Sequence, residues 1–341
     1  MKKRKKLVTM LLCAALVIAL LVGCGGQTAA PVDSGDENGN GQAEAPSYTI
    51  GVINFMEHMA LEAAFNGFVD ALADRGYVDG DNITIMYDNA QGDMSNLSTI
   101  ADRLINRNVD MILSITTPAT QTIAGKTTNI PILGTAVTSY VIAGIIDSNE
   151  APGGNVSGTS DMNPVSAQID LVVDLVPDVQ TIGLIYNSSE DNSVIQISLA
   201  KERIEAIGLD WHEVTVTNPG DVLQAMQSLV GRVEAIYVPA CNTMASAMPA
   251  VHSVAMGARV PTICGANSMV LDGGLATMGI DYYELGYMTG IMAIDVLNGA
   301  NPGTMPIQFA ASSDLITING LVAEEIGFIV PERFIPYVVF P

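Results

Sequence analysis

Two stretches of the chain, VDMILSITTPAT at residues 109–120 and VEAIYVPACNTM at residues 233–244, share one order of features. Each joins an acidic residue, a short apolar run, a small polar loop and the start of a helix-like segment. Each is followed by an apolar run that a proline introduces, NIPILGT at residues 129–135 and RVPTICG at residues 259–265. An apolar run of this length between turn residues is typical of a parallel strand buried on both faces. One such unit would indicate little, because all strand–helix units resemble one another. The same order of features in two units predicts two similar α/β lobes.

The segments before these two units also repeat in the same order. First strands are expected at residues 48–54 and 181–187, with helices at 61–72 and 194–207. Second strands follow at 83–87 and 211–217, with helices at 97–105 and 222–230. Because strand and helix alternate, we expect parallel sheets with right-handed crossovers. The polar loop after each strand then lies at the carboxyl edge of its sheet, where open α/β sheets bind ligands.

The rest of the chain is less regular. The sharpest break is NEAPGGN at residues 149–155, after which residues 156–161 lead to a first crossing between the lobes. A strand is expected at 275–281, a long helix at 283–297, strands within 307–320 and a short helix at 321–327. Gly286 and Gly290, four residues apart in the long helix, would allow close packing. The helix is amphipathic, which favours a soluble core helix over a membrane segment.

The first 47 residues predict a targeting segment and a tether. MKKRKK at residues 1–6 is a basic region, and the apolar run at 7–21 is too short for a comfortable membrane span. The sequence LVGC at residues 21–24 resembles a bacterial lipobox, which implies a signal peptide at 1–23 and a lipidated Cys24 (palmitate) as the new first residue. An ordinary signal peptide with a chance cysteine is the alternative. Residues 24–47 are expected to form a flexible tether, because a segment without aromatic residues cannot bury enough apolar surface to order itself.

Charge, cysteine and histidine content exclude several classes of function. Removal of residues 1–23 leaves nine basic and 36 acidic residues, a net charge of −27. Such a protein repels phosphate backbones, so no nucleic-acid partner is expected. Cys241 and Cys264 remain in an exported protein, where a disulfide is allowed, although two separate semi-buried thiols are favoured. The three histidines are far apart in sequence, and neither a metal site nor a cofactor is predicted.

The polar loops indicate a binding protein rather than an enzyme. They supply hydroxyl and amide side chains at strand ends, and helix N-termini there suit a carboxylate. Each such residue alone could be only a helix cap. An enzyme would need more: Glu57 and His58 are adjacent and therefore poorly placed to share one site, and the sequence has no Gly-x-Ser-x-Gly elbow or phosphate loop.

From residue 49 to about 327 the chain resembles the ABC-transporter substrate-binding lipoproteins of the tryptophan/tyrosine-binding type. The resemblance rests on several short segments: GVI at 51–53, EH at 57–58, YDNAQGD at 87–93, PGGNVSG at 152–158, IYN at 185–187, QSLV at 227–230 and GIDYYELGY at 279–287. It implies an α/β fold of the type I periplasmic-binding kind, with two doubly wound parallel-sheet lobes joined by three crossover strands. The crossings are expected near residues 158–162, 280–284 and 309–314. The N-terminal lobe would comprise 48–158 plus 282–310, and the C-terminal lobe 159–281 plus 311–341.

The resemblance also implies a function. The protein would be lipid-anchored through Cys24 at the outer face of the bacterial cytoplasmic membrane. It would capture a small amino acid-like ligand, aromatic or bulky and apolar, in the cleft between the lobes and deliver it to an ABC permease with its ATPase. Two alternatives stay open: a ligand-sensing receptor of the same fold, and a neutral purine-like or apolar ligand instead of an amino acid.

The candidate ligand-binding residues lie in the loops that would face the cleft. They are Phe55, Glu57, Thr116, Thr117, Pro118, Thr138, Ser139, Asp161, Asn187, Ser188, Asn192, Cys241, Asn242, Asn267 and Asp281. The chain departs from the family in three of these loops: Ser139 and Tyr140 stand where an Asp-Pro pair is usual, Cys241 stands where an aspartate is usual, and residues 265–269 lack an acid.

These departures leave Asp161, Glu57 and Asp281 as possible counter-ions for a ligand ammonium. Thr116 and Thr117, after the strand of the first repeated unit, offer hydroxyls and N–H groups to a carboxylate.

Overall fold

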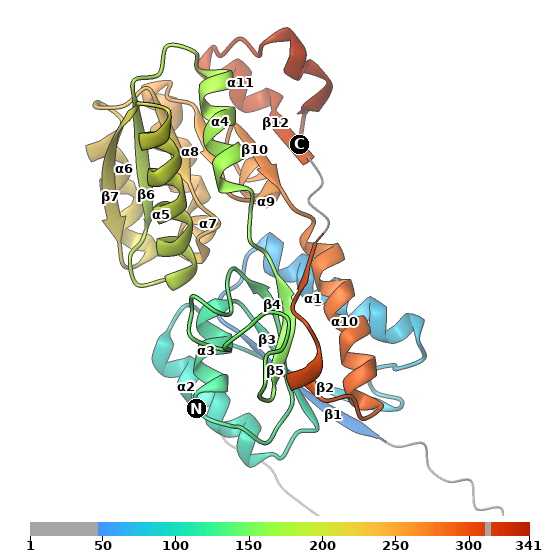
Figure 1. Cartoon of the computed structure of the whole chain (residues 1–341). Coiled ribbons are helices and arrows are strands. Elements are labelled where there is room, and N and C mark those ends of the chain that lie inside the picture. The colour runs from blue at the N-terminus through green and yellow to red at the C-terminus, as the bar shows by residue number, and fades with distance from the viewer. Residues whose placement is uncertain (1–46, 311–314) are drawn as a thin grey trace, which may run out of the picture. The chain divides into compact units, whose positions relative to one another are not determined.

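The first strand–helix series forms a six-stranded parallel sheet in the computed structural model of the chain, which describes residues 47–310 and 315–341 (Figure 1). Its order is β11-β5-β4-β3-β1-β2. The strands are β1 (Tyr48–Asn54), β2 (Ile83–Asn89), β3 (Met111–Ile115), β4 (Ile132–Val137), β5 (Val156–Ser160) and β11 (Gln308–Phe309). The helices packed with this sheet are α1 (Met59–Asp74), α2 (Met94–Asn106), α3 (Thr117–Ala124) and α10 (Tyr282–Leu297). We call this part the first lobe.

The second series forms a seven-stranded sheet in the order β13-β12-β10-β9-β8-β6-β7. We call this sheet and its helices the second lobe. The strands are β6 (Thr181–Asn187), β7 (Asp210–Val216), β8 (Ala235–Val238), β9 (Thr262–Cys264), β10 (Ala276–Gly279), β12 (Leu315–Asn319) and β13 (Val338–Val339). The helices are α4 (Val165–Leu175), α5 (Asp191–Ala206), α6 (Val222–Leu229), α7 (Asn242–Ser246), α8 (Met248–Ala258), α9 (Asn267–Leu271) and α11 (Gly320–Ile326). Short 3-10 turns lie at Pro219–Asp221, Pro302–Thr304 and Glu332–Tyr337.

The two repeated sequence units lie in the interior of the two sheets, as predicted. β3 and β4 come from the first unit and β8 and β9 from the second, and every residue of these four strands is buried. The strand before each unit pairs with it in parallel, β1 with β3 and β6 with β8. The two-lobed α/β fold predicted from the sequence is therefore confirmed.

The structure differs from the predicted elements in places. The prediction of wholly parallel sheets is wrong for β10 and β12, which pair antiparallel. β12 follows a segment arriving from the first lobe rather than a crossover helix, so nothing requires it to run parallel. α5 also begins at Asp191, three residues before the helix that the apolar spacing predicted.

The chain passes between the lobes at three places. It leaves β5 at Ser160 and enters α4 at Val165, and it leaves β10 at Gly279 and enters α10 at Tyr282. The third passage joins β11 to β12, and residues 311–314 of it lie outside the described residues. The predicted signal peptide, Cys24 and almost all of the predicted tether also lie outside them.

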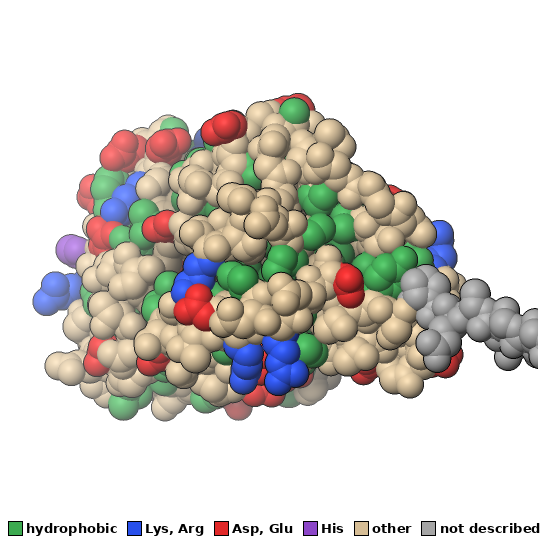
Figure 2. All heavy atoms as spheres, turned by 90° about the horizontal axis from the view of Figure 1, so that it is seen from below, with side chains coloured by type: hydrophobic (Ala, Val, Ile, Leu, Met, Phe, Trp, Pro, Cys, Tyr) green, Lys and Arg blue, Asp and Glu red, His purple; other side chains and the backbone are tan. Residues whose placement is uncertain are grey.

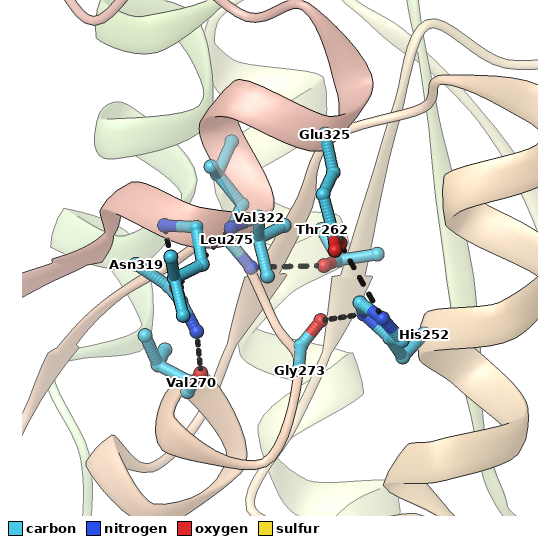
Figure 3. Close-up of polar contacts among 9 residues, drawn as sticks. His252, Thr262, Val270, Gly273, Leu275, Asn319, Val322 and Glu325 are labelled. Atoms are coloured by element: carbon cyan, nitrogen blue, oxygen red, sulfur yellow. Dashed lines mark hydrogen bonds and ion pairs between the residues drawn. The ribbon is translucent and has the colours of Figure 1, made fainter. Parts of the chain in front are cut away.

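Asn319, at the end of β12, ties the last passage to the second sheet (Figure 3). Its side-chain Nδ2 donates to the carbonyl of Val270 at 2.9 Å, and its Oδ1 accepts from the backbone N–H of Val322 at 3.2 Å. Beside it, His252 Nδ1 lies 3.0 Å from the carbonyl oxygen of Gly273. These contacts fix the loop after α9 and the start of α11 against the strand edge.

The described surface reflects the acidic composition. The face shown in Figure 2 carries acidic side chains scattered among uncharged ones and basic side chains at only a few places. No helix in the described part of the chain is long and apolar enough to cross a membrane.

Glycines bring α1 and α10 into backbone contact, although the two helices lie more than 200 residues apart in sequence (Figure 1). A Cβ atom added at Gly286 would overlap the carbonyl of Ala64, and one at Gly290 would lie 2.7 Å from the carbonyl oxygen of Phe68. On the facing helix, a Cβ at Gly67 would overlap the carbonyl of Tyr283. The close packing predicted from the spacing of Gly286 and Gly290 is confirmed, and α10 therefore belongs with the first lobe.

We predict that Gly286→Ala destabilises the protein by about 1–3 kcal/mol, because the methyl group forces the two helices apart. Gly257→Ala is the matched control: Gly257 lies in α8 and a Cβ there meets nothing within 4 Å. The control should be neutral or stabilising by about 0.5–1 kcal/mol through helix propensity alone. Denaturant unfolding followed by circular dichroism measures both variants, and equal unfolding midpoints would contradict this account of the packing.

Candidate functional site

A cavity lies where the carboxyl ends of the central strands of the two lobes meet. The first lobe contributes the start of α1, the end of β4 and the start of α10. The second lobe contributes α7, the first turns of α5 and α9, and the loops before α7 and α9. The lining residues are His58, Ala60, Leu61, Ala136, Asp161, Asn192, Ala240, Cys241, Asn242, Ala245, Ala266, Ser268, Met269 and Tyr282. Apolar walls with a few polar groups are the usual composition of a small-molecule site.

Asp161 is a buried carboxylate in this wall, 5% exposed, in the first passage between the lobes. The hydroxyl of Thr138 donates to its Oδ1 at 2.9 Å, and the hydroxyl of Tyr282 donates to its Oδ2 at 2.8 Å. Burial raises the pKa of Asp161 above its ordinary value, and the two hydroxyl donors offset this only in part. None of the ion pairs within the described residues includes Asp161. A ligand cation at this position would supply the positive charge that the carboxylate lacks.

Glu190 is a second buried carboxylate, 2% exposed, and it organises the loops of the second lobe. Its Oε2 accepts from the backbone N–H and the side-chain Nδ2 of Asn242, at 3.0 and 2.7 Å. Its Oε1 accepts from the backbone N–H and the hydroxyl of Thr243, at 2.9 and 2.6 Å. Glu190 thereby caps α7, where free N–H groups favour a negative charge.

His58 joins the two lobes at this cavity. It is the N-cap residue of α1, and its Nε2 lies 3.3 Å from Oδ1 of Asn242 in the second lobe. Burial lowers the pKa of His58, which favours the neutral imidazole. A second contact between the lobes is a hydrogen bond that Gln121 Nε2 donates to Asp191 Oδ2 at 2.8 Å. Both contacts cross from one lobe to the other, and the first of them lies in the cavity wall.

Four of the residues predicted from the sequence line the cavity: Asp161, Asn192, Cys241 and Asn242. Three other predicted residues do not line the cavity but form hydrogen bonds with residues around it. Thr138 donates to Asp161, Thr117 Oγ1 accepts from the backbone N–H of Thr138 at 3.3 Å, and Asn187 Nδ2 donates to Thr243 Oγ1 at 2.8 Å.

The other predicted residues do not line this cavity. Phe55 packs in the apolar core of the first lobe, and Glu57 and Ser188 are exposed. Thr116 caps α3, which Pro118 helps to begin, and Ser139 accepts from the backbone N–H of Ile142. Thr116 and Ser139 thus act as a helix cap and a turn residue, which is the alternative role that the sequence left open for the polar loop residues.

Asn267 and Asp281 line a neighbouring cavity, which shares Ala60, Ser268 and Tyr282 with the first. Asp281 there caps α10 by accepting from the N–H groups of Tyr283 and Glu284.

The sequence analysis missed His58, Tyr282 and Ser268 as cavity residues and missed Glu190 altogether. His58 and Tyr282 stand in two of the segments that carried the family resemblance, so a signal for them existed. Glu190 follows two serines in a polar loop, and its role depends on α7, which begins 52 residues later. Sequence spacing alone carries no signal for such a contact.

Both described cysteines are free and fully buried, more deeply than expected. Burial raises the pKa of the Cys264 thiol to about 12 and raises that of Cys241 as well, so both are neutral thiols. Cys241 thus gives the cavity wall an uncharged group. Within residues 47–310 and 315–341, no cluster of three or more His, Cys, Asp or Glu side chains could hold a metal ion.

Comparison with known proteins agrees with this architecture. Residues 49–338 match the family model described as ABC transporter substrate binding protein. A curated relative, the tyrosine-binding protein of Clostridioides difficile (strain R20291), is 38% identical over 316 residues, which cover 93% of this chain and 91% of that protein.

Solved structures lead to the same family. An ABC domain in complex with L-Trp from Streptococcus pneumonia is 36% identical with a TM-score of 0.83, covering 86% of this chain and 100% of that one. The ligand-free, open structure of a substrate-binding protein with adhesive properties from Clostridium difficile is 38% identical with a TM-score of 0.66, covering 86% of this chain and 99% of that one. A conserved domain protein from Vibrio cholerae is 34% identical with a TM-score of 0.84, covering 86% and 99%.

The two-lobed type I periplasmic-binding fold, the match along nearly all of the described chain and the level of identity to these relatives lead to one conclusion. The chain belongs to the ABC transporter substrate-binding protein family, whose members bind solutes and are not enzymes.

Proposed function

We propose that this protein captures an amino acid with an aromatic side chain between its lobes and delivers it to an ABC permease and its ATPase. The observation that carries the proposal is the buried Asp161 carboxylate, which meets hydroxyl donors but no cation among the described residues and faces a cavity with apolar walls. The ammonium of an amino acid is the complementary group. The relatives named above as tyrosine-binding and as a complex with L-Trp support an aromatic amino acid.

The walls of the cavity are largely apolar, but the space between them is about 20 Å³, so they must move apart before an aromatic side chain can enter. Ala60, Leu61, Ala136, Ala245 and Met269 surround it and offer contact without competing polar atoms. Burial of an aromatic side chain against them contributes the non-directional part of the affinity. The start of α3 is a poor partner for the ligand carboxylate, because Pro118 has no N–H, and the N–H groups of Ala119 and Thr120 are already paired with Thr116.

The arrangement of the lobes supports closure around a ligand. The chain superposes on the L-Trp complex with a TM-score of 0.83 but on the ligand-free, open relative with only 0.66, although the two are nearly equal in sequence identity. The contact between His58 and Asn242 crosses from one lobe to the other and requires them to be close. A ligand that bridges the lobes would stabilise this arrangement by mass action.

The amino-terminal residues support a location outside the cytoplasm. We propose that Cys24 carries lipid and holds the domain at the outer face of the cytoplasmic membrane, because LVGC at residues 21–24 follows a basic and an apolar segment in the order of a lipoprotein signal.

Replacement of Asp161 by Ala should weaken binding of L-tryptophan or L-tyrosine at least a hundredfold. Loss of one partner of a desolvated ion pair costs about 3–5 kcal/mol, and each 1.4 kcal/mol is about tenfold in affinity. Asp178→Ala, at an exposed position outside the cavity, is the control and should leave affinity unchanged. Calorimetry measures all three proteins. If the wild type binds no amino acid, or binds one as tightly without Asp161, the assignment is wrong and a neutral purine-like or apolar ligand becomes the leading candidate.

Replacement of Asp161 by Asn should raise the thermal stability of the ligand-free protein at pH 7. The pKa of Asp161 is raised above its ordinary 3.8 by burial, so the ionised form costs folding free energy at every pH above the folded-state value. Below pH 3.8 both folded and unfolded states hold the proton, and the difference between variant and wild type should disappear. Melting curves from pH 3.5 to 8 test this, with Asp178→Asn as the control. A variant that is less stable than the wild type at pH 7 would count against the raised pKa.

Replacement of Cys24 by Ala should move the protein from the membrane fraction to the soluble fraction, because the lipid anchor can no longer be attached. Immunoblotting of fractionated cells measures the distribution. Cys241→Ala is the matched control: it removes a buried thiol of the domain and should leave membrane retention intact. Unchanged retention of the Cys24→Ala protein would remove the proposal of a lipid anchor.

A further inference from the structure

Two buried acceptor atoms in the cavity wall have no hydrogen-bond partner among the described residues. They are Nδ1 of His58, from the first lobe, and Oδ1 of Asn192, from the second. Buried polar atoms are nearly always paired, and one left unpaired costs free energy. A ligand with donor groups in this cavity would complete the pairing of both atoms.

The contacts of Asn242 decide which nitrogen of His58 carries the proton. The side-chain Nδ2 of Asn242 donates to Glu190 at 2.7 Å, so its Oδ1 is the atom turned toward His58. An amide oxygen only accepts, and Nε2 of His58 must therefore be the donor in the 3.3 Å contact. Burial keeps the imidazole neutral, so Nδ1 carries no hydrogen. The unpaired atom of His58 is an acceptor, fixed in that state by Glu190 through Asn242.

The orientation of Asn192 is fixed in a similar way. Its Nδ2 donates to the carbonyl of Ala240 at 3.0 Å, and the opposite orientation would set two oxygens against each other. Its Oδ1 is therefore the atom left unpaired. The cavity wall therefore carries three acceptor groups: Nδ1 of His58, Oδ1 of Asn192 and the carboxylate of Asp161. A complementary ligand has several hydrogen-bond donors.

His58 and Asp161 serve different parts of a ligand. Asp161 lies in the passage between the lobes, between Thr138 and Tyr282, whereas His58 begins α1 and meets α7. If Asp161 binds the ligand ammonium, Nδ1 of His58 is available to a different donor group of the ligand.

We propose that Nδ1 of His58 accepts a hydrogen bond from an N–H or O–H on the ligand's side chain and so sets the specificity of the site. The site then selects an aromatic side chain with a donor, an indole or a phenol, over a phenyl ring of similar size. This inference rests on the proposed function, because it takes the ligand to be an amino acid. It goes further in naming the atom that discriminates between amino acids.

The test compares ligands that differ only in the donor. Calorimetry with the wild-type protein would use L-tyrosine against L-phenylalanine, and L-tryptophan against 3-benzothienyl-L-alanine, in which sulfur replaces the indole N–H. The donor-bearing member of at least one pair should bind at least tenfold more tightly, since a site built around a hydrogen bond rejects the analogue that lacks it. Equal affinities within both pairs overturn the proposal.

Replacement of His58 by Leu should bring the preferred pair close to equal affinity, mainly by weakening the donor-bearing ligand. His212→Leu is the matched control, because His212 is exposed on β7 away from the cavity, and it should keep the wild-type ratio. A His58→Leu protein that keeps the ratio overturns the proposal.

A measurement on the wild type does not depend on the folding of any variant. Two-bond ¹H–¹⁵N correlation spectra distinguish the two neutral tautomers of histidine, and the ligand-free protein should show His58 with its proton on Nε2. A proton on Nδ1 overturns the proposal.

The outcomes also separate this inference from the proposed function. If no amino acid binds to the wild type, both fail. If amino acids bind and Asp161→Ala weakens them but the donor makes no difference, only the role of His58 fails.

Discussion

The cleft side of the second lobe depends on one buried carboxylate, that of Glu190. α7 has only five residues, Asn242–Ser246, and a helix this short is not stable on its own. Glu190 accepts from two of its first backbone N–H groups and from two of its side chains, all within 3.0 Å. Charge-assisted hydrogen bonds of this kind are among the stronger ones in proteins. They fix the loop after β8, the amide of Asn242 and, through that amide, the imidazole of His58.

The two buried carboxylates of the cleft show why burial alone does not identify a functional residue. Glu190 is surrounded by donors that belong to the same lobe, so its charge is already compensated. Among the described residues, Asp161 accepts from the hydroxyl groups of Thr138 and Tyr282 and forms no ion pair, and burial raises its pKa. The first is a structural group whose environment is complete. The ionised carboxylate of Asp161 lowers the stability of the ligand-free protein, as is often found for ligand-binding residues.

The sequence predicted the fold because the fold rests on local patterns. Apolar runs such as residues 111–115 and 235–238 are buried on both faces, and that pattern is readable without a structure. The antiparallel β12 was not predicted, because its direction depends on the route by which the chain returns from the first lobe. Strand direction at a sheet edge is a matter of topology rather than of composition.

The candidate site was predicted only in part, for a related reason. Asp161, Asn192, Cys241 and Asn242 stand at strand ends, where the topology of an α/β sheet places ligands. Phe55 stands at such an end too, but its side chain turns into the apolar core, and the sequence does not specify that rotation. Glu190 and His58 gain their roles from Asn242, which lies 52 and 184 residues away. Contacts at this range follow from the assembled fold and have no local pattern.

The glycine contact between α1 and α10 has a consequence for how the protein is made. The first lobe contains the start of the domain, yet α10 and β11 reach it only after the whole sequence of the second lobe up to β10 has been synthesised. Until residues 282–297 leave the ribosome or the export channel, α1 exposes the surface of Ala64, Gly67 and Phe68 that α10 will cover. The second lobe is interrupted in the same way, because β12, α11 and β13 follow only after β11. During vectorial synthesis and export, the first lobe therefore stays incomplete until residues 282–309 emerge, and the second lobe until residues 315–339 emerge.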